Sequence, residues 1–209
     1  MFITFEGPEG SGKTRQAAAL ADFLRQQGYE VLLTREPGGT QIGDQIRAIL
    51  SDLKNVAMRP RTETLLFQAS RAQLVEEVIR PRLEKGDLVL SDRYADSTLA
   101  YQGYGHCFNL DELRALIRFA TGGLSPDLTL LLDIDVETGL RRKVSGGEWN
   151  RLDAYDLEFH RRVRSGFLEL ARQEPQRWVL IDAGQPPDAV QAAVREVVMQ
   201  RLPAPSKHA

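Results

Sequence analysis

The chain has 209 residues and a formal net charge of -2, with 42% hydrophobic and 27% charged residues. This composition is ordinary for a globular protein with a buried core. A net charge so near zero argues against nucleic acid as a partner, and no apolar run is long enough for a membrane span or a signal peptide. The one cysteine, Cys107, excludes an internal disulfide and fits a cytoplasmic location.

Apolar residues recur with strand and helix periods that alternate along the chain. Strands are expected at residues 2–6, 30–34, 88–91, 128–134 and 178–182. Helices are expected at residues 13–27, around 42–50, at 62–83 with a bend near Pro81, up to residue 120 from a capping pattern at Asn109 and Glu112, and at 136–143, 156–172 and 187–201. Five strands separated by helices predict an α/β fold with a doubly wound, five-stranded parallel sheet flanked by helices.

Residues 1–202 are expected to form a single domain, because no linker, repeat or low-complexity segment interrupts the alternation of elements. The stretch 143–153 is polar and contains adjacent glycines, which predicts a short lid rather than a domain linker. Residues 203–209 follow the final helix and carry two prolines, so they are expected to form a C-terminal tail.

The strongest motif is GPEGSGKT, which fits the pattern G-x-x-x-x-G-K-[ST] between an apolar strand and a helix. Glycines let successive backbone N–H groups turn toward an anion, and the helix N-terminus adds partial positive charge. Lys13 can reach the β- and γ-phosphates of a nucleotide, and the Thr14 hydroxyl can bind Mg²⁺. The motif predicts an ATP site formed by Gly7, Pro8, Glu9, Gly10, Ser11, Gly12, Lys13 and Thr14.

This phosphate loop alone does not choose between a switch GTPase, a motor ATPase and a small kinase. The chain lacks the Asn-Lys-x-Asp and Asp-x-x-Gly patterns of guanine-specific switches. A motor ATPase usually needs a longer chain and a partner. A small kinase needs an acceptor site and a lid that excludes water, and the sequence has candidates for both.

Charged residues follow two of the predicted strands. Asp92 and Arg93 come after strand 88–91, and Arg35 follows strand 30–34. Ligands of open α/β sheets bind at the carboxyl ends of strands, so Asp92 is expected to hold Mg²⁺ or orient Arg93, and Arg93 to bind a phosphate. A strand-end salt bridge between these two residues is the alternative. Arginine at two strand ends favours an anionic acceptor.

Six segments occur in one order over nearly the whole chain: the phosphate loop with Glu9, TREPGGT (34–40), LFQASR (66–71), SDRY (91–94), STLAYQG (97–103) and PDLTLLLD (126–133). In these segments the chain resembles the thymidylate kinases, and TREPGGT together with DRY is more diagnostic than the phosphate loop. The resemblance implies a P-loop kinase fold, a homodimer, and transfer of the γ-phosphate of Mg-ATP to dTMP. The product, dTDP, would supply dTTP synthesis.

The resemblance also implies roles for single residues. Glu9 would lie near the acceptor sugar and in the water shell of Mg²⁺, together with Thr14 and Asp92 as metal-site residues. The alternative for Glu9 is an acid stabilised by the helix dipole. Phe67 would stack on thymine, and Arg71, one helical turn later, would bind the carbonyl edge of the base.

The other residues implied in acceptor binding hold the phosphate or line the nucleoside. The full substrate-binding set is Glu9, Arg35, Pro37, Phe67, Arg71, Arg93, Ser97, Thr98, Tyr101 and Gln102. Tyr101 is the candidate for excluding a 2′-hydroxyl group. Arg47 is a weaker candidate for the phosphate, because it lies on an ordinary helix.

The catalytic arginine of the lid is less directly assigned. Gly10 follows Glu9, which implies the version of the family whose arginine lies in the lid. Arg142 and Arg151 are the best matches, ahead of Arg141 and Lys143, and Arg142 is also expected to bind ATP. The implied catalytic residues are Lys13, Glu9, Arg93, Asp92, Arg142 and Arg151.

Two other functions stay open. One is another nucleoside monophosphate kinase or a deoxynucleoside kinase. The other is a regulatory protein that binds a nucleotide without turnover. Glu9, Asp92 and Arg93 argue against the second, because ATP binding alone needs none of these acceptor-side residues. No cluster of thiols or histidines suggests zinc.

Overall fold

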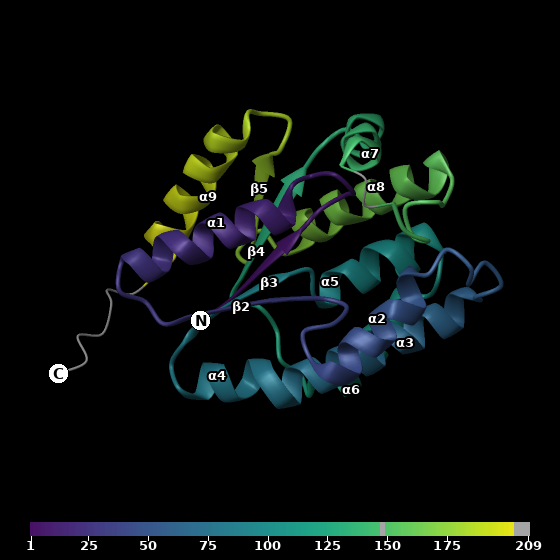
Figure 1. The fold of residues 1–209 in the computed structure, drawn as a ribbon, viewed down its shortest axis with the longest axis horizontal. Coiled ribbons are helices and arrows are strands. Elements are labelled where there is room, and N and C mark those ends of the chain that lie inside the picture. The colour runs from purple at the N-terminus through teal and green to yellow at the C-terminus, as the bar shows by residue number, and fades with distance from the viewer. Residues whose placement is uncertain (147–148, 203–209) are drawn as a thin grey trace.

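The computed structural model describes residues 1–146 and 149–202, a range in which five strands form one parallel sheet (Figure 1). The strands are β1 (Phe2–Glu6), β2 (Val31–Arg35), β3 (Leu88–Asp92), β4 (Leu128–Asp133) and β5 (Trp178–Asp182). Their order across the sheet is β2-β3-β1-β4-β5, and every pairing is parallel. The predicted doubly wound α/β fold is confirmed.

Helices connect the strands and cover both faces of the sheet. They are α1 (Lys13–Gln26), α2 (Gln41–Ser51), α3 (Pro60–Leu74), η1 (Val75–Ile79), α4 (Arg80–Glu84), α5 (Ala95–Thr98), η2 (Leu99–Gly105), α6 (Leu110–Thr121), α7 (Val136–Ser145), α8 (Leu157–Gln173) and α9 (Pro187–Arg201), where η denotes a π-helix. No helix within the described residues is both long and apolar enough to cross a membrane.

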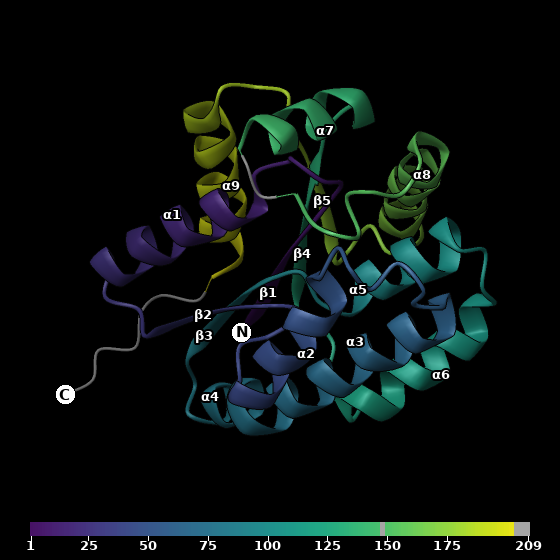
Figure 2. The same ribbon diagram turned by 45° about the vertical axis from the view of Figure 1, so that its right-hand side comes forward.

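Successive residues of each strand pack on opposite faces of the sheet, as strand geometry requires. Leu130 and Leu132 of β4 pack on the face covered by α1 and α9, whereas Leu131 packs with η2 and α8 on the other face. Phe2 and Val89 contact α3 and η1 on that second face. Figures 1 and 2 show these two helical layers with the sheet between them. The near-continuous apolar character of β4 follows from this double burial.

The structure corrects two predictions about helices. The helical segment expected at 62–83 begins at Pro60. It changes from α-helix to π-helix at η1, which ends before Pro81. The sequence analysis expected no helix between residues 91 and 109, where α5 and η2 lie. Glycines at positions 103 and 105 weaken the helical pattern there. Other boundaries differ by one or two residues, which is ordinary for helix and strand ends.

The parallel pairing brings the carboxyl ends of the strands to one edge. Phe5 pairs with Asp92, and Arg35 also pairs with Asp92, so the segments that follow β1, β2 and β3 lie side by side. Glu6 pairs with Leu131 of β4. These strand ends and the loops after them form the candidate active site.

Candidate active site

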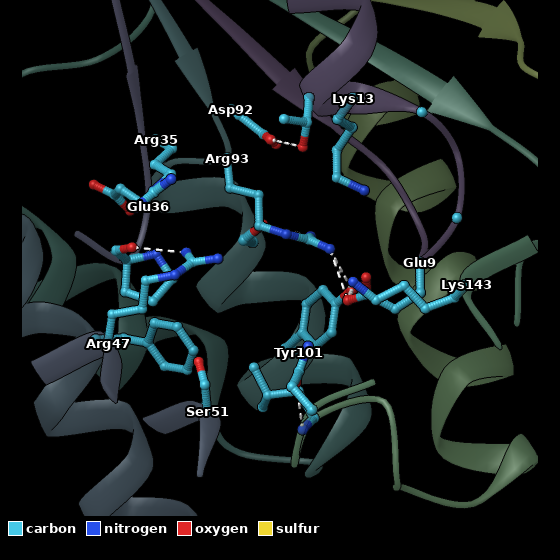
Figure 3. Close-up of a pocket in the computed structure, with 18 of the residues that line it drawn as sticks. Glu9, Lys13, Arg35, Glu36, Arg47, Ser51, Asp92, Arg93, Tyr101 and Lys143 are labelled. Carbon is cyan, nitrogen blue, oxygen red and sulfur yellow. Dashed lines mark hydrogen bonds and ion pairs between the residues drawn. The ribbon is translucent and has the colours of Figure 1, made fainter. Parts of the chain in front are cut away.

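A pocket of about 720 Å³ lies along this edge of the sheet and is drawn in Figure 3. The phosphate loop forms one end, and α3 and η2 form the other. Most of the residues predicted from sequence line it: Glu9, Gly10, Gly12, Lys13, Thr14, Arg35, Pro37, Phe67, Arg71, Asp92, Arg93, Ser97, Thr98, Tyr101, Gln102 and Arg142. Side chains that the sequence analysis left out or ranked low also line it, including Glu36, Arg47, Ser51, Lys143 and Trp149.

Lys13 is held over the phosphate loop. Its Nζ donates to the carbonyl oxygens of Gly7 at 3.0 Å and Pro8 at 2.8 Å, and to Ser11 Oγ at 3.1 Å. Burial and the nearby Arg93 guanidinium lower the pKa of Lys13 to about 8. The ammonium group is therefore still mostly charged at neutral pH, which suits binding of phosphate oxygens.

The loop packs directly against the backbone of α7. A Cβ atom at Gly10 would lie 2.0 Å from the carbonyl oxygen of Gly139, and one at Gly139 would lie 2.2 Å from the carbonyl oxygen of Glu9. Real Cβ atoms do not approach so closely. Both glycines are therefore required by the contact between the loop and α7, which fixes where the phosphate site lies.

Arg93 joins the phosphate loop to the acceptor side of the pocket (Figure 3). Its Nη2 donates to Glu9 Oε1 at 2.7 Å and to the Tyr101 hydroxyl at 3.0 Å, and the Tyr101 hydroxyl donates to Glu9 Oε1 at 2.7 Å. Its Nη1 donates to Ser97 Oγ at 3.2 Å and to the Gly7 carbonyl at 3.3 Å. The backbone of Arg93 has φ of 70°, an unusual conformation that functional sites often contain.

The same contacts keep both Glu9 and Arg93 in their charged forms. Burial alone would raise the pKa of Glu9, but Arg93 and Lys13 outweigh it and lower that pKa to about 2. Burial opposes the charge on Arg93, and Glu9 outweighs this effect and raises its pKa. The carboxylate is therefore ionised beside a phosphate site without an uncompensated negative charge.

Thr14 and Asp92, two of the expected metal-site residues, lie in direct contact. The Thr14 hydroxyl donates directly to Asp92 Oδ2, and both side chains line the pocket. A hydroxyl and a carboxylate are oxygen ligands, which Mg²⁺ prefers alongside water and substrate phosphates. The described part of the chain gathers no group of three or more His, Cys, Asp or Glu that would form an all-protein metal cage. The donor set fits Mg²⁺ carried with a nucleotide.

Three arginines surround the middle of the pocket. Arg35, Arg47 and Arg93 all line it, and Figure 3 shows them from three different elements. Arg47 Nη1 donates to the Pro37 carbonyl at 2.9 Å, and burial together with Arg35 lowers the pKa of Arg47. Like charges gathered without enough carboxylates favour an anion between them. Arg47, the weakest of the three candidates for binding the acceptor phosphate, thus lines the same pocket as Arg93, the strongest candidate.

At the far end of the pocket, Arg71 is 1% exposed and lies beside Phe67. Its Nε and Nη2 bind Glu36, with Nη2 2.5 Å from Oε2, and Nη2 also donates to the Tyr94 carbonyl at 3.0 Å. Its Nη1 donates to Gln68 Oε1 at 3.0 Å and Thr98 Oγ1 at 2.9 Å. Protein acceptors thus occupy all the N–H groups of the guanidinium. A base carbonyl would have to share one of them.

The two predicted lid arginines lie in different places. Arg142 Nη1 donates to the Ala183 carbonyl at 2.9 Å. It lines both the main pocket and a smaller one of about 360 Å³ beside Gly10 and Gly12. Arg142 therefore lies at the donor side, next to the phosphate loop.

Arg151, for which the resemblance implies a catalytic role, lines neither pocket. It is 7% exposed, and its Nη2 is 2.5 Å from Glu63 Oε2. Its Nε donates to the Leu50 carbonyl at 2.9 Å. The buried carboxylate of Glu63 holds this arginine outside the lining of the pocket. Lys143 instead lines the pocket, and its charge contributes to the low pKa of Glu9.

Sequence reasoning missed Glu6, the residue just before the phosphate loop. Glu6 is fully buried and accepts hydrogen bonds from the backbone N–H groups of Tyr94 at 2.8 Å and Ser97 at 3.3 Å. Its Oε2 lies 2.6 Å from Ser97 Oγ. Burial raises the pKa of Glu6 to about 8. The sequence offers one indication, an acidic residue at the end of an apolar strand. This pattern also fits a strand end that is exposed to solvent, so it does not predict a buried glutamate.

Comparison with known proteins agrees with this geometry. The sequence model of the family described as "Thymidylate kinase" matches residues 5–194. A thymidylate kinase of Roseiflexus castenholzii is 54% identical, over 95% of this chain and 92% of its own length. A thymidylate kinase of Deinococcus radiodurans is 52% identical, over 96% and 97%. The crystal structure of thymidylate kinase from Ehrlichia chaffeensis has a TM-score of 0.80 and 34% identity, and the match covers 95% and 98% of the two chains. The chain belongs to the thymidylate kinase family.

Proposed function

We propose that this protein transfers the γ-phosphate of ATP to dTMP, forming dTDP and ADP for dTTP synthesis. The observation that carries the proposal is a single pocket with a phosphate loop at one end and Phe67 at the other, and with Arg93 between them. A donor and an acceptor nucleotide fit end to end in such a site. The relatives named thymidylate kinase support dTMP as the acceptor.

ATP is the proposed ligand of residues 7–14. The backbone N–H groups and Lys13 would bind its phosphates, and Arg142 would bind at the donor side, where it lines the smaller pocket. Thr14 and Asp92 would hold Mg²⁺, with Glu9 close enough to act through its water shell. Bound Mg²⁺ neutralises charge that develops on the phosphate oxygens.

Acceptor binding is assigned to the rest of the pocket. Arg35, Arg47 and Arg93 would hold the monophosphate, and Phe67 would stack on the thymine ring. The base and sugar would contact Pro37, Arg71, Ser97, Thr98, Tyr101 and Gln102, which all line the pocket. The hydroxyl of Tyr101, held on Glu9, would occupy the space of a 2′-hydroxyl and so favour deoxyribose.

Transfer then depends on position and charge rather than on a strong base. The acceptor phosphate is already ionised at neutral pH, so its oxygen can attack in line without losing a proton to the protein. Arg93 reaches both Glu9 and the acceptor side, so its guanidinium can stabilise charge on the group in transit. Lys143 and Arg142 would add positive charge from α7.

The lid assigned to residues 143–153 and the single domain 1–202 are part of the proposal. Residues 147–148 of the lid, and the expected tail 203–209, lie outside the described residues. A cytoplasmic location is also proposed, on the basis of the single cysteine and the metabolic role.

A homodimer completes the proposal. Exposed apolar side chains gather on three neighbouring helices, α2, α3 and α6, which Figure 2 shows side by side. They are Ile42, Ile49, Leu65 and Phe119, with exposed fractions of 52%, 47%, 58% and 90%. A monomer gains little by exposing such a surface, whereas a second copy would bury it.

The reaction is tested by identifying its products. Purified protein is incubated with Mg-ATP and dTMP, and nucleotides are separated and quantified. We expect dTDP and ADP in equal amounts, and no ADP when dTMP is replaced by thymidine, which lacks the phosphate. ADP formation without dTDP would show an ATPase, and binding of ATP with no turnover of dTMP, dUMP, dCMP or AMP would support a regulatory protein.

A further inference from the structure

Glu63, which the reaction as described does not use, lies in α3 one helical turn before Phe67. Its side chain is fully buried. The two carboxylate oxygens have different partners: Oε1 accepts from Gln102 Nε2 at 2.8 Å and lies 3.4 Å from His106 Nε2, and Oε2 accepts from Arg151 Nη2 at 2.5 Å and the Tyr155 hydroxyl at 2.8 Å. A buried carboxylate with this many donors is a built feature and not an accident of packing.

The partners keep Glu63 ionised. Burial alone would raise the pKa of Glu63, but the neighbouring His106 and the hydrogen-bonded Arg151 outweigh it and lower that pKa to about 2. An ionised carboxylate accepts hydrogen bonds and cannot donate them. Whatever lies against Oε1 must therefore present a donor at every physiological pH.

This requirement fixes the amide of Gln102. The Gln102 side chain is 1% exposed and lines the pocket beside Phe67. Because its NH₂ group must face Glu63, its carbonyl oxygen Oε1 is the atom left for a ligand. In the described part of the structure no protein group donates to that oxygen. The amide is therefore held in one of its two possible orientations, with an acceptor free for the pocket.

We propose that Glu63 is a positioning residue that sets which pyrimidine the pocket accepts, by making Gln102 present an acceptor to the base. The inference rests on the proposed function, with the base bound at Phe67. Thymine and uracil carry an N–H donor at N3, whereas cytosine carries a lone pair there. The fixed carbonyl would bind the first two and repel the third, because two acceptors would face each other in a buried site.

The proposal also gives Arg151 a role different from the one its sequence position suggests. Arg151 holds Glu63 in its charged form and ties the segment after the lid to α3 and to the Leu50 carbonyl. Tyr155 adds a second donor to the same oxygen. Arg151 thus acts on the acceptor base through Glu63 and Gln102, and not on the transferring phosphoryl group.

The test is Glu63→Gln, which keeps the shape of the side chain and removes the charge. An amide at position 63 can present either its oxygen or its NH₂ group, so Gln102 is free to turn over. ADP release is measured with dTMP, dUMP and dCMP. We expect the ratio of kcat/KM for dTMP over dCMP to fall at least 10-fold, mainly through the KM values. The ratio of kcat/KM for dTMP over dUMP should stay within twofold of the wild-type ratio, because both bases carry the same N3 donor.

Two variants separate this effect from lost stability. Glu63→Asp keeps an acceptor-only group, so its dTMP over dCMP ratio should stay near that of the wild type even if all rates fall. Asp96→Asn is matched in burial, since Asp96 is 4% exposed and lies 2.6 Å from Arg177 without lining the pocket. It should lower the melting temperature and leave the ratio unchanged. An unchanged ratio in folded Glu63→Gln would overturn the proposal.

The wild-type protein provides an independent arm if Glu63→Gln does not fold. Binding of dTMP is compared with that of dCMP and of dTMP methylated at N3, which has lost the donor. We expect both analogues to bind at least 10-fold more weakly than dTMP, and equal binding would refute the fixed carbonyl. Failure of the proposed function is distinguishable, because the wild type would then use none of the monophosphates.

Discussion

Arg93 is the residue on which both ends of the pocket depend. It follows β3, contacts Glu9 of the phosphate loop, and reaches Tyr101 on the acceptor side. Its place at a strand end could be predicted from the sequence, because parallel strands end at a common edge. The orientation of individual side chains could not. Arg151 is two residues from the pocket-lining Trp149 in the chain, yet the buried Glu63 holds it elsewhere, and no local pattern reveals that pairing.

Replacing Arg93 tests its part in transfer. We expect Arg93→Ala to lower kcat at least 100-fold, because it removes positive charge from the group in transit, while the dissociation constant for Mg-ATP changes no more than about threefold. Steady-state kinetics and calorimetry measure the two quantities. Equal losses of ATP affinity and turnover would mean that Arg93 supports the phosphate loop instead.

Glu6 provides a prediction about pH. Burial raises the pKa of Glu6 to about 8 in the folded protein, against the ordinary value of 4.5 for an exposed glutamate, so between these values the folded state binds a proton that the unfolded state does not. Stability from this group is therefore lost as pH rises from about 5 through 8. In Glu6→Gln the amide is neutral at every pH. Its oxygen can accept from the backbone N–H groups of Tyr94 and Ser97, and its NH₂ group can donate to Ser97 Oγ.

The melting temperature of wild type minus that of Glu6→Gln should accordingly fall between pH 5 and pH 8 and then level off. Taking this difference cancels the pH dependence that comes from the other titrating groups, because both proteins contain them. A difference that stays constant over this range would show that Glu6 does not hold a proton in the folded protein.

At the scale of elements, the strands and long helices could be predicted because their apolar residues repeat with clear periods. The α5–η2 segment could not, and its glycines explain why. A Cβ atom at Gly103 would lie 2.4 Å from Leu110, and one at Gly105 would lie 2.6 Å from Phe159. Gly105 is needed for close packing against the Phe159 ring of α8, and Gly103 lets Leu110 of α6 lie close, so residues that permit the tertiary contacts also weaken the helical signal in the sequence.

The contact between the phosphate loop and α7 is another element-scale feature that no spacing indicates. Gly139→Ala would place a methyl group against the carbonyl of Glu9, so the loop or the helix must move. We expect the affinity for Mg-ATP to fall at least 10-fold and the melting temperature to drop. Arg141→Ala, on the exposed face of the same helix, should change the affinity less than twofold.

Calorimetric titration with Mg-ATP decides between the outcomes. Wild-type affinity in folded Gly139→Ala would show that the loop tolerates displacement from α7. A loss of similar size in Arg141→Ala would show that α7 acts through its charge and not through backbone packing.

At the scale of the whole molecule, α2 and α3 line the pocket through Arg47, Ser51, Phe67 and Arg71. None of the exposed apolar side chains of α2, α3 and α6 lines it, and Figure 2 shows these three helices side by side. Self-association through these helices would therefore leave the substrate site open. It would also stabilise α2 and α3, which line the acceptor end of the pocket. The helices could be predicted from sequence, but which of their apolar residues stay exposed depends on how they pack, and packing is a property of the complete fold.

Phe119, 90% exposed on α6, is the side chain to change. We expect Phe119→Asp to raise the dissociation constant of the dimer at least 10-fold in sedimentation equilibrium, because a charge would have to be buried at the interface. Met199→Asp is the control, since Met199 is 41% exposed on α9, away from this surface. A monomeric wild type, or equal effects of the two variants, would exclude this surface as the interface.

The most direct test of the account is a crystal structure with dTMP and a non-hydrolysable ATP analogue bound together. The account predicts the analogue's phosphates on residues 7–14, the phosphate of dTMP within hydrogen-bond distance of Arg93, and the thymine ring against Phe67. A dTMP molecule bound at the smaller pocket beside Ala183, or with its base away from Phe67, would contradict the assignment of donor and acceptor ends.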